Sequence, residues 1–284
     1  MENSSGLWYP RPSATNPNVL DPPLEAPIKV PTSEEFRTHF AQGVWNEQAN
    51  IISLPGSFNA LIQPETPPVA FAFLDLDEVV GNLGGSVQLV INPNFPRDSF
   101  THNYGDPKFI NHADKISRDA LIRLVKQQQQ PGVGMQPVAE VETINTLVHI
   151  WREMGVYVVF LTSAMQGAEL SHVDFIAKYF RGTCDGIVIT RNSNGNHGDK
   201  GLAAVTVADF AGTTKGMSAI AIDDVGSNTK KIREALQAHP ANFRIATFQH
   251  HFASNKSTDL ESTLAGTPLE AFVGATHFLQ AALA

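Results

Sequence analysis

The chain has 284 residues, of which 42% are hydrophobic, so it can bury the core of one large domain or of two small ones. Its net charge of -8 and the absence of a long Lys/Arg run argue against a protein that binds nucleic acid through clustered positive charge. Its single cysteine, Cys184, excludes an intrachain disulfide and a cysteine-rich zinc site, and we expect it to be a small buried apolar residue.

The amino-terminal residues show no targeting segment. No basic start is followed by an apolar stretch within residues 1–31, and no window of the chain approaches the ~18 apolar residues of a membrane span. We therefore expect a soluble protein, cytoplasmic by default, without a cleavable secretory signal. Export by a route that reads no such signal stays open.

Residues 1–31 form a proline-rich arm, whose 7 prolines interrupt any helix or sheet ladder. We expect this arm to be extended, and either disordered or laid along the rest of the protein. Residues 32–68 are a separate stretch. Thr32 and Glu35 have the spacing of a capping box and predict a helix to about Asn46, and a turn-rich passage from Pro55 to Pro68 then leads to the core.

From residue 69 onwards, short apolar runs alternate with amphipathic segments. The runs are typical of strands buried on both faces of a parallel sheet, and they are Val69–Leu74, Val156–Leu161, Gly186–Thr190, Ser218–Ile222 and Phe243–Phe248. The amphipathic segments predict helices at Val141–Met154, Ser171–Phe180, Leu202–Phe210 and Thr229–His239. This alternation predicts an α/β domain over residues 69–284, a Rossmann-like doubly wound parallel sheet whose ligands gather at the carboxyl ends of the strands.

Two carboxylates follow the first predicted strand. Asp75 and Asp77 are two residues apart, and in an extended chain they face the same side. They repel each other unless a cation or a proton lies between them, so the pair suits either Mg²⁺ coordination or a division into nucleophile and acid/base. Taken alone, the pair is explained as well by two exposed loop acids.

Three later strand ends add complementary groups. Thr162 and Ser163 place hydroxyls at a predicted helix start, which suits a phosphate oxygen. Lys200 follows a glycine-rich stretch and can balance phosphate and carboxylate charge. Asp223 and Asp224 supply oxygen ligands for a hard cation. Each has an ordinary alternative, namely a helix cap, a solvated charge or a turn, but their joint occurrence at strand ends favours one site.

At these residues the sequence resembles the haloacid dehalogenase-like (HAD) superfamily. The four motifs of the superfamily are matched, in order, by Asp75-Leu-Asp77-Glu-Val79, Thr162, Lys200 and Asp223-Asp224. The resemblance runs from about Val69 to Phe248 or beyond and does not cover the arm. It implies that Asp75 is the nucleophile and that Asp77 is the general acid/base.

The resemblance also implies the other roles. Thr162 and Lys200, with Ser163 beside them, would bind the transferring phosphoryl group. Mg²⁺ would be held among Asp75, Asp77, Asp223 and Asp224, with either or both of the last two as ligands, and Asn228 falls where members often place a further polar residue.

The acid at Asp77 distinguishes among HAD chemistries, because phosphatases and phosphomutases carry an acid there, dehalogenases lack it and cation-pumping ATPases replace it. We therefore expect a magnesium-dependent phosphomonoester hydrolase that works through an aspartyl-phosphate. Its partner would be a phosphorylated substrate, either a small metabolite or a protein side chain such as phosphotyrosine, and not a nucleic acid. The oligomeric state is left open.

The chain between Asp75 and Thr162 is longer than one strand-to-helix crossover requires, so we expect a small cap insertion at about residues 81–137. It contains a turn-rich stretch, Pro93–Asp106, and a predicted helix, Asp114–Gln130. In the superfamily an insertion here selects the substrate. Candidate contacts, each of which also suits an ordinary surface residue, are His102, Asn103, Tyr104, His112 and Arg118 in the cap, and Arg191, His250 and His251 after later strands.

Two alternatives were weighed against the phosphatase. A two-component receiver domain also uses paired acids, a hydroxyl and a lysine, but there the lysine comes last, whereas Lys200 precedes Asp223. A catalytically inactive HAD-like protein that binds partners through its arm and cap is the remaining alternative, and the presence of every motif group argues against it.

Overall fold

A computed structural model of the protein describes residues 11–12, 20–21, 30–45, 49–54, 57–82, 135–164, 167–191, 198–250 and 258–284. Within the proline-rich arm it describes a short antiparallel pair, in which β1 (Arg11–Pro12) lies beside β2 (Leu20–Asp21). None of the helices in the described part of the chain has the length and the apolar character needed to cross a bilayer.

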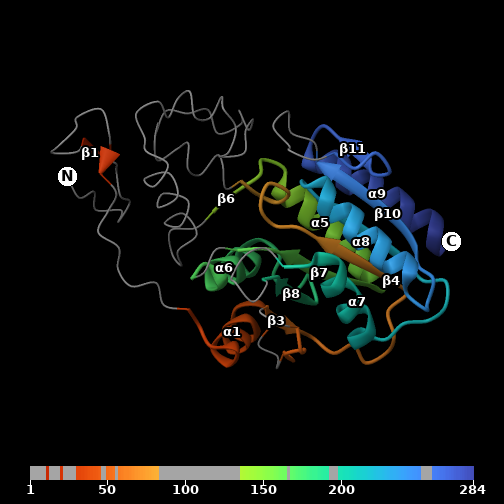
Figure 1. The fold of residues 1–284 in the computed structure, drawn as a ribbon, viewed down its shortest axis with the longest axis horizontal. Coiled ribbons are helices and arrows are strands. Elements are labelled where there is room, and N and C mark those ends of the chain that lie inside the picture. The colour runs from red at the N-terminus through yellow and green to blue at the C-terminus, as the bar shows by residue number, and fades with distance from the viewer. Residues whose placement is uncertain are drawn as a thin grey trace.

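A seven-stranded sheet forms the centre of the protein, in the order β11-β10-β9-β4-β7-β8-β3. Its strands are β3 (Phe58–Leu61), β4 (Ala70–Leu74), β7 (Val156–Thr162), β8 (Gly186–Ile189), β9 (Ser218–Asp223), β10 (Arg244–His250) and β11 (Thr263–Ala265). All neighbours are parallel except β3 and β8, which pair antiparallel at one edge. The predicted α/β, Rossmann-like parallel sheet is confirmed (Figure 1).

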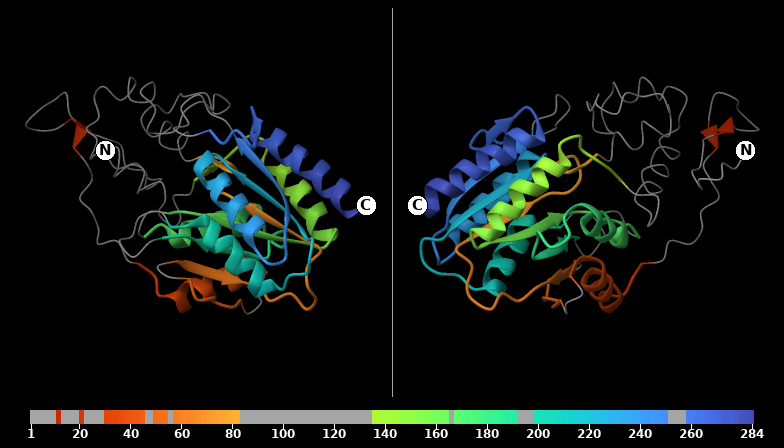
Figure 2. Two further views of the ribbon diagram at one scale, coloured as in Figure 1. Left: turned by 45° about the vertical axis from the view of Figure 1, so that its right-hand side comes forward. Right: turned by 180° about the vertical axis from the view of Figure 1, so that it is seen from behind.

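Helices cover both faces of this sheet (Figure 2). One face is covered by α1 (Ser33–Phe40), α5 (Val141–Glu153), α6 (Glu169–Tyr179) and α9 (Pro268–Leu283), and the other by α7 (Lys200–Ala211) and α8 (Gly226–Ala238). Strand β4 serves both layers, because Ala70, Ala72 and Leu74 pack into the first while Phe71 and Phe73 pack into the second. All five of its residues are buried, which explains the unbroken apolar run in the sequence.

The capping box predicted at Thr32 is present. The Thr32 hydroxyl accepts from the Glu35 N–H at 3.1 Å, and the Glu35 carboxylate accepts from the Thr32 N–H at 2.8 Å. The α-helix that follows ends at Phe40, and a π-helical turn, η1 (Ala41–Trp45), occupies the rest of the predicted helix. The helical segment therefore begins where the sequence places it, but its last turn is wider.

The predicted cap lies mostly outside the described residues, as do Pro93–Asp106 and Asp114–Gln130. Its two ends are described. Strand β5 (Gly81–Asn82) pairs antiparallel with β6 (Gln136–Pro137), so the two ends of the predicted insertion lie side by side.

Three elements of the core were not predicted. Strand β3 lies inside the passage interpreted as turns between Pro55 and Pro68, β11 is a three-residue edge strand, and α9 is a long carboxyl-terminal helix. Helix α9 packs against α5, where Trp151 stacks on Phe272 with ring centroids 5.5 Å apart and donates its indole N–H to the Thr276 hydroxyl at 2.9 Å.

Candidate active site

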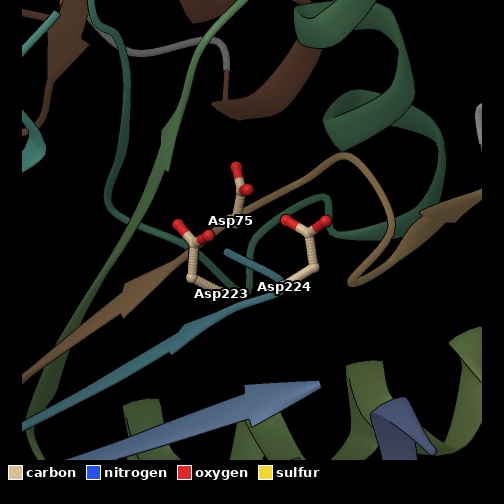
Figure 3. Close-up of side chains that lie close together, drawn as sticks. All are labelled: Asp75, Asp223 and Asp224. Atoms are coloured by element: carbon tan, nitrogen blue, oxygen red, sulfur yellow. The ribbon is translucent and has the colours of Figure 1, made fainter. Parts of the chain in front are cut away.

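Asp75 and Asp223 are brought together by the register of the central strands. Strands β4 and β9 are parallel neighbours with Leu74 opposite Ile222, so the residues that follow each partner are adjacent at the carboxyl edge of the sheet. The Asp75 N–H donates to the Ile222 carbonyl at 2.8 Å and continues the ladder by one residue. One carboxylate oxygen from each of Asp75, Asp223 and Asp224 lies within 4.8 Å of the others, and Figure 3 shows the three groups facing a shared space.

Lys200 ties two of these acids together. Its Nζ lies 2.9 Å from Asp75 Oδ1 and 2.7 Å from Asp223 Oδ2, and the residue is only 2% exposed. Lys200 is the first residue of α7. Asp199 caps this helix by accepting from the N–H groups of Gly201 and Leu202. The helix cap thus fixes the backbone from which the Lys200 side chain extends.

The helix that carries Lys200 is held close to its neighbour α8. A Cβ added at Gly201 would lie 2.6 Å from the Lys231 carbonyl oxygen, so only glycine permits this approach of the two helices.

The cluster of Asp75, Asp223, Asp224 and Lys200 has more carboxylates than cations. Burial, reinforced by Asp223, raises the pKa of Asp75 to about 7, although Lys200 lowers it. Burial and the neighbouring Asp223, Asp75 and Glu78 raise the pKa of Asp224 well above its usual value. Burial lowers the pKa of Lys200, but Asp223 and Asp75 outweigh this effect and raise it. A hard cation among these oxygens would relieve the repulsion, so the residues fit Mg²⁺.

Two side-chain amides contact Asp223 and Asp224 at the end of β9. Asp223 Oδ1 accepts from the Val225 N–H at 2.8 Å and from Asn228 Nδ2 at 3.1 Å. Gln249, fully buried on β10, donates from Nε2 to the Asp224 carbonyl oxygen at 3.1 Å. Asn228 was a candidate from the sequence, whereas Gln249 was not.

Asp77 lies beside this cluster and not within it. Its carboxylate is absent from the group of three described above, and its Oδ1 is 3.6 Å from Nε2 of His172, a buried residue in the first turn of α6. Burial lowers the pKa of His172, but the contact with Asp77 and the charge of Asp75 outweigh it and raise the pKa. Nothing in the sequence around His172 indicated its contact with Asp77, because this contact depends on how α6 packs.

Thr162 and Ser163 end the strand on the other side of β4. Thr162 is fully buried, and its Oγ1 meets no hydrogen-bond partner among the described residues, while its carbonyl accepts from the Thr190 N–H at 2.8 Å. Ser163 Oγ lies 2.8 Å from Thr190 Oγ1, so this hydroxyl is already engaged within the protein. The register of β4 and β7, with Leu74 opposite Phe160, places both at the carboxyl edge that carries Asp75.

The remaining candidates fall into two groups. Arg191 is buried in an ion pair with Glu169, with N–O distance 2.6 Å, and donates from Nε to the Ala164 carbonyl at 3.1 Å. His250 is buried at the end of β10, with Nδ1 2.8 Å from the Glu78 carbonyl. Cys184 is buried as expected, and burial raises the pKa of its thiol. The others, which lie outside the described residues, are His102, Asn103, Tyr104, His112, Arg118 and His251.

Glu78 is an acid of this region that the sequence analysis passed over. Its backbone adopts a left-handed conformation, with φ of 63°, in the turn that returns the chain to Gly81. The Glu78 N–H donates to the Gly81 carbonyl at 2.7 Å, and the residue is 4% exposed. This turn fixes the backbone between Asp75 and the start of the insertion.

No protein-family model matches the chain, and no curated protein sequence matches it. Solved structures similar to it include HAD-like hydrolases. A haloacid dehalogenase-like family hydrolase from Xanthomonas campestris is 8% identical over 78% of this chain and 97% of its own, with a TM-score of 0.43. The HAD domain of the effector protein Lem4 from Legionella pneumophila is 14% identical over 66% of this chain and 88% of its own, with a TM-score of 0.34. Identities this low leave the chemistry to be argued from the residues of this chain.

Proposed function

We propose that this protein is a magnesium-dependent phosphomonoester hydrolase in which Asp75 carries the phosphoryl group. The observation that supports it best is the buried Asp75 carboxylate, held by Lys200 at the edge of the sheet next to Asp223 and Asp224. This carboxylate would be a poor structural element, because burial and the neighbouring Asp223 raise its pKa to about 7 although Lys200 lowers it. Perturbed carboxylates grouped at a strand end are typical of functional sites.

The two oxygens of Asp75 are not equivalent. Oδ1 accepts from the Leu76 N–H at 2.9 Å and from Lys200 Nζ at 2.9 Å. These donors hold the carboxylate in one orientation and leave Oδ2 for attack on phosphorus. Because the two donors remain when the phosphoryl group is attached, they also hold the phosphoaspartate in place.

Asp75, Asp223 and Asp224 are the residues that would hold Mg²⁺, which supplies positive charge to offset the phosphate and the three carboxylates. We assign Asp77 to acid–base chemistry alone, because its carboxylate is not part of that cluster. Lys200 adds a second positive charge, and the buried Thr162 hydroxyl, free of partners among the described residues, supports a role in holding a phosphate oxygen.

The proposed reaction has two steps. First, Asp75 Oδ2 forms a bond to phosphorus, the ester P–O bond breaks, and the proton of Asp77 moves to the departing oxygen. Second, a water oxygen forms a bond to phosphorus, the bond between phosphorus and Asp75 breaks, and the water proton returns to Asp77. Phosphate leaves and both carboxyl groups recover their starting forms.

The substrate we propose is a small phosphorylated metabolite or a phosphorylated protein side chain such as phosphotyrosine. Selection would fall to the insertion at about 81–137, which joins the domain next to Asp77 through β5 and β6. We also propose the domain division 1–31, 32–68 and 69–284, with the last as the catalytic domain.

Hydrolysis of an aryl phosphate, with and without Mg²⁺, tests this proposal. We expect turnover that EDTA abolishes and that Asp75→Asn removes. Mass spectrometry of rapidly quenched Asp77→Asn protein should locate phosphate on Asp75. Phosphate on Asp77 would reverse the two roles. Turnover without any phosphorylated residue would point to direct attack by water, and no turnover over a broad substrate panel would favour the inactive binding protein.

A further inference from the structure

His172 is a buried histidine that neither the sequence motifs nor the proposed reaction uses. It is 1% exposed and lies in the first turn of α6, with its ring folded back toward Ala168. Buried polar side chains are normally satisfied by a partner or retained for a function, so the contacts of its two ring nitrogens identify its role.

The first nitrogen fixes the orientation of the ring. Nδ1 lies 3.0 Å from the Ala168 carbonyl oxygen, and because a carbonyl only accepts, Nδ1 must carry the hydrogen. The same carbonyl accepts from the Ser171 hydroxyl at 2.8 Å and from the His172 N–H at 3.3 Å. These contacts hold the imidazole at the start of α6, with Nε2 on the side of the ring away from Ala168.

The second nitrogen faces Asp77. Nε2 is 3.6 Å from Asp77 Oδ1, and neither atom meets a hydrogen-bond partner among the described residues. The distance is slightly longer than a hydrogen bond, and such contacts in catalytic sites commonly tighten when substrate binds.

The backbone of Asp77 is already fixed. The N–H groups of Val80 and Gly81 both donate to the Leu76 carbonyl, at 3.1 and 2.8 Å, and close the turn around it. What remains variable is the rotation of the partly exposed Asp77 side chain. His172 is a side chain whose ring nitrogen faces this carboxylate.

We propose that His172 is a positioning residue, which holds the Asp77 carboxylate apart from Asp75, Asp223 and Asp224 so that it faces the ester oxygen of the substrate. This inference rests on the proposed function, because it needs Asp77 to deliver and recover the proton in the two steps given above. In this role His172 acts through Asp77 and not on the substrate.

The test compares two esters in the full-length protein with Mg²⁺. We expect His172→Leu to lower kcat on an alkyl phosphate about 100-fold, because this leaving oxygen needs a well-placed proton. Phosphoaspartate formation from p-nitrophenyl phosphate should fall less than about 10-fold, since that leaving group needs none. His172→Gln, whose amide can both donate and accept a hydrogen bond, should recover part of the loss. His149→Leu, an exposed histidine on α5, serves as the matched control.

A double substitution separates positioning from a structural role. If His172 acts through Asp77, then His172→Gln should change the rate by less than about 3-fold once Asp77 is Asn. An undiminished effect in that background, or equal losses on both esters, would overturn the inference. Absence of a phosphoaspartate in the wild-type protein would instead overturn the proposed function, so the two failures are distinguishable. Thermal melts establish that each variant is folded.

Discussion

Two buried carboxylates in this protein have the same exposed fraction but opposite pKa shifts. Asp75 and Asp259 are each 6% exposed. Asp259 accepts from Arg233 with both oxygens, and from the hydroxyls of Thr229 at 3.1 Å and Ser262 at 2.7 Å. Burial raises the pKa of Asp259, but these donors outweigh it and lower the pKa to about 2, whereas that of Asp75 rises to about 7.

At similar exposed fractions, the two sites differ in the balance of charge and hydrogen-bond donors around the carboxylate. At Asp259 one guanidinium and two hydroxyls meet one carboxylate, so the charge is fully compensated. At Asp75 three carboxylates share one ammonium. A compensated buried pair is an ordinary structural element, but an uncompensated cluster lowers stability and is retained where a ligand supplies the missing charge.

The largest expected effect separates activity from stability at Asp75. We expect Asp75→Asn to reduce turnover by on the order of 10⁴-fold or more, since it removes the proposed nucleophile. The same change should raise the free energy of unfolding of the metal-free protein by on the order of 1–3 kcal/mol at about pH 8, because it removes a buried, crowded charge.

The gain in free energy of unfolding on Asp75→Asn should depend on pH, because the pKa of Asp75 is raised in the folded protein. The pKa of Asp75 is about 7 in the folded protein against a reference of 3.8, so its ionisation increasingly destabilises the fold as pH rises between those values. Denaturant unfolding should therefore show a smaller gain for Asp75→Asn at about pH 4.5 than at about pH 8. Loss of stability at both pH values would mean that the cluster is not strained by charge.

At Asp259 we expect a substitution to lower the free energy of unfolding without lowering the catalytic rate. Asp259→Ala leaves the buried Arg233 guanidinium with the exposed Glu261 carboxylate and the Thr247 hydroxyl, which should cost about 3–5 kcal/mol. The pKa of Asp259 is about 2, below its reference of 3.8, so its contribution is present above about pH 4 and disappears only as pH falls toward 2. Equal losses at about pH 4.5 and 8, with kcat per folded molecule unchanged, would sharpen the contrast with Asp75.

Mg²⁺ should stabilise the folded protein by binding to Asp75, Asp223 and Asp224 and not to Asp259. At a 100-fold excess over Kd, we expect it to raise the free energy of unfolding by about 2.7 kcal/mol, seen as a higher melting temperature. Asp224→Asn should lose most of this increment, because it removes one of the three clustered carboxylates, whereas Asp259→Asn should keep it. The same increment in the Asp224 variant would place the ion elsewhere.

The main strands and helices were predictable because parallel strands buried on both faces leave unbroken apolar runs. β4 and β9 are buried at every position, and the sequence located both within a residue of their observed ends. Strand β3 left no such signal, since it has four residues and one of them, Asn59, is a buried amide that pairs with the backbone of Ile52. Helix α9 did carry a start signal that was not used, because Thr267 caps the Glu270 N–H ahead of the apolar stretch.

The candidate site divides in the same way. Asp75, Lys200 and Asp223 were found from the sequence because strand register brings the carboxyl ends of neighbouring strands together. His172 and Gln249 were missed, since each reaches the site through a contact between elements far apart in the chain. Local patterns specify which elements form, whereas such contacts follow from how the elements pack.

The smallest expected effect concerns the link between the two clusters. Gln249 is fully buried, donates to the Asp224 carbonyl at 3.1 Å and accepts from the Asp259 N–H at 3.0 Å, so one amide joins both sites. Gln249→Leu leaves that buried N–H without its acceptor, and we expect a cost of about 1–3 kcal/mol by denaturant unfolding.

The same substitution should weaken Mg²⁺ binding by about 10-fold, measured by calorimetry, because Asp224 loses the contact that orients its peptide. Gln249→Glu keeps an acceptor for the Asp259 N–H but loses the donor to Asp224, so it should weaken metal binding while restoring part of the stability. If Gln249→Leu changes stability alone, the two clusters are independent. A change in both stability and Mg²⁺ binding shows that the Asp259 cluster supports the cluster of Asp75, Asp223 and Asp224. The stability lost by crowding these three carboxylates would then be offset partly by the ion pair between Arg233 and Asp259.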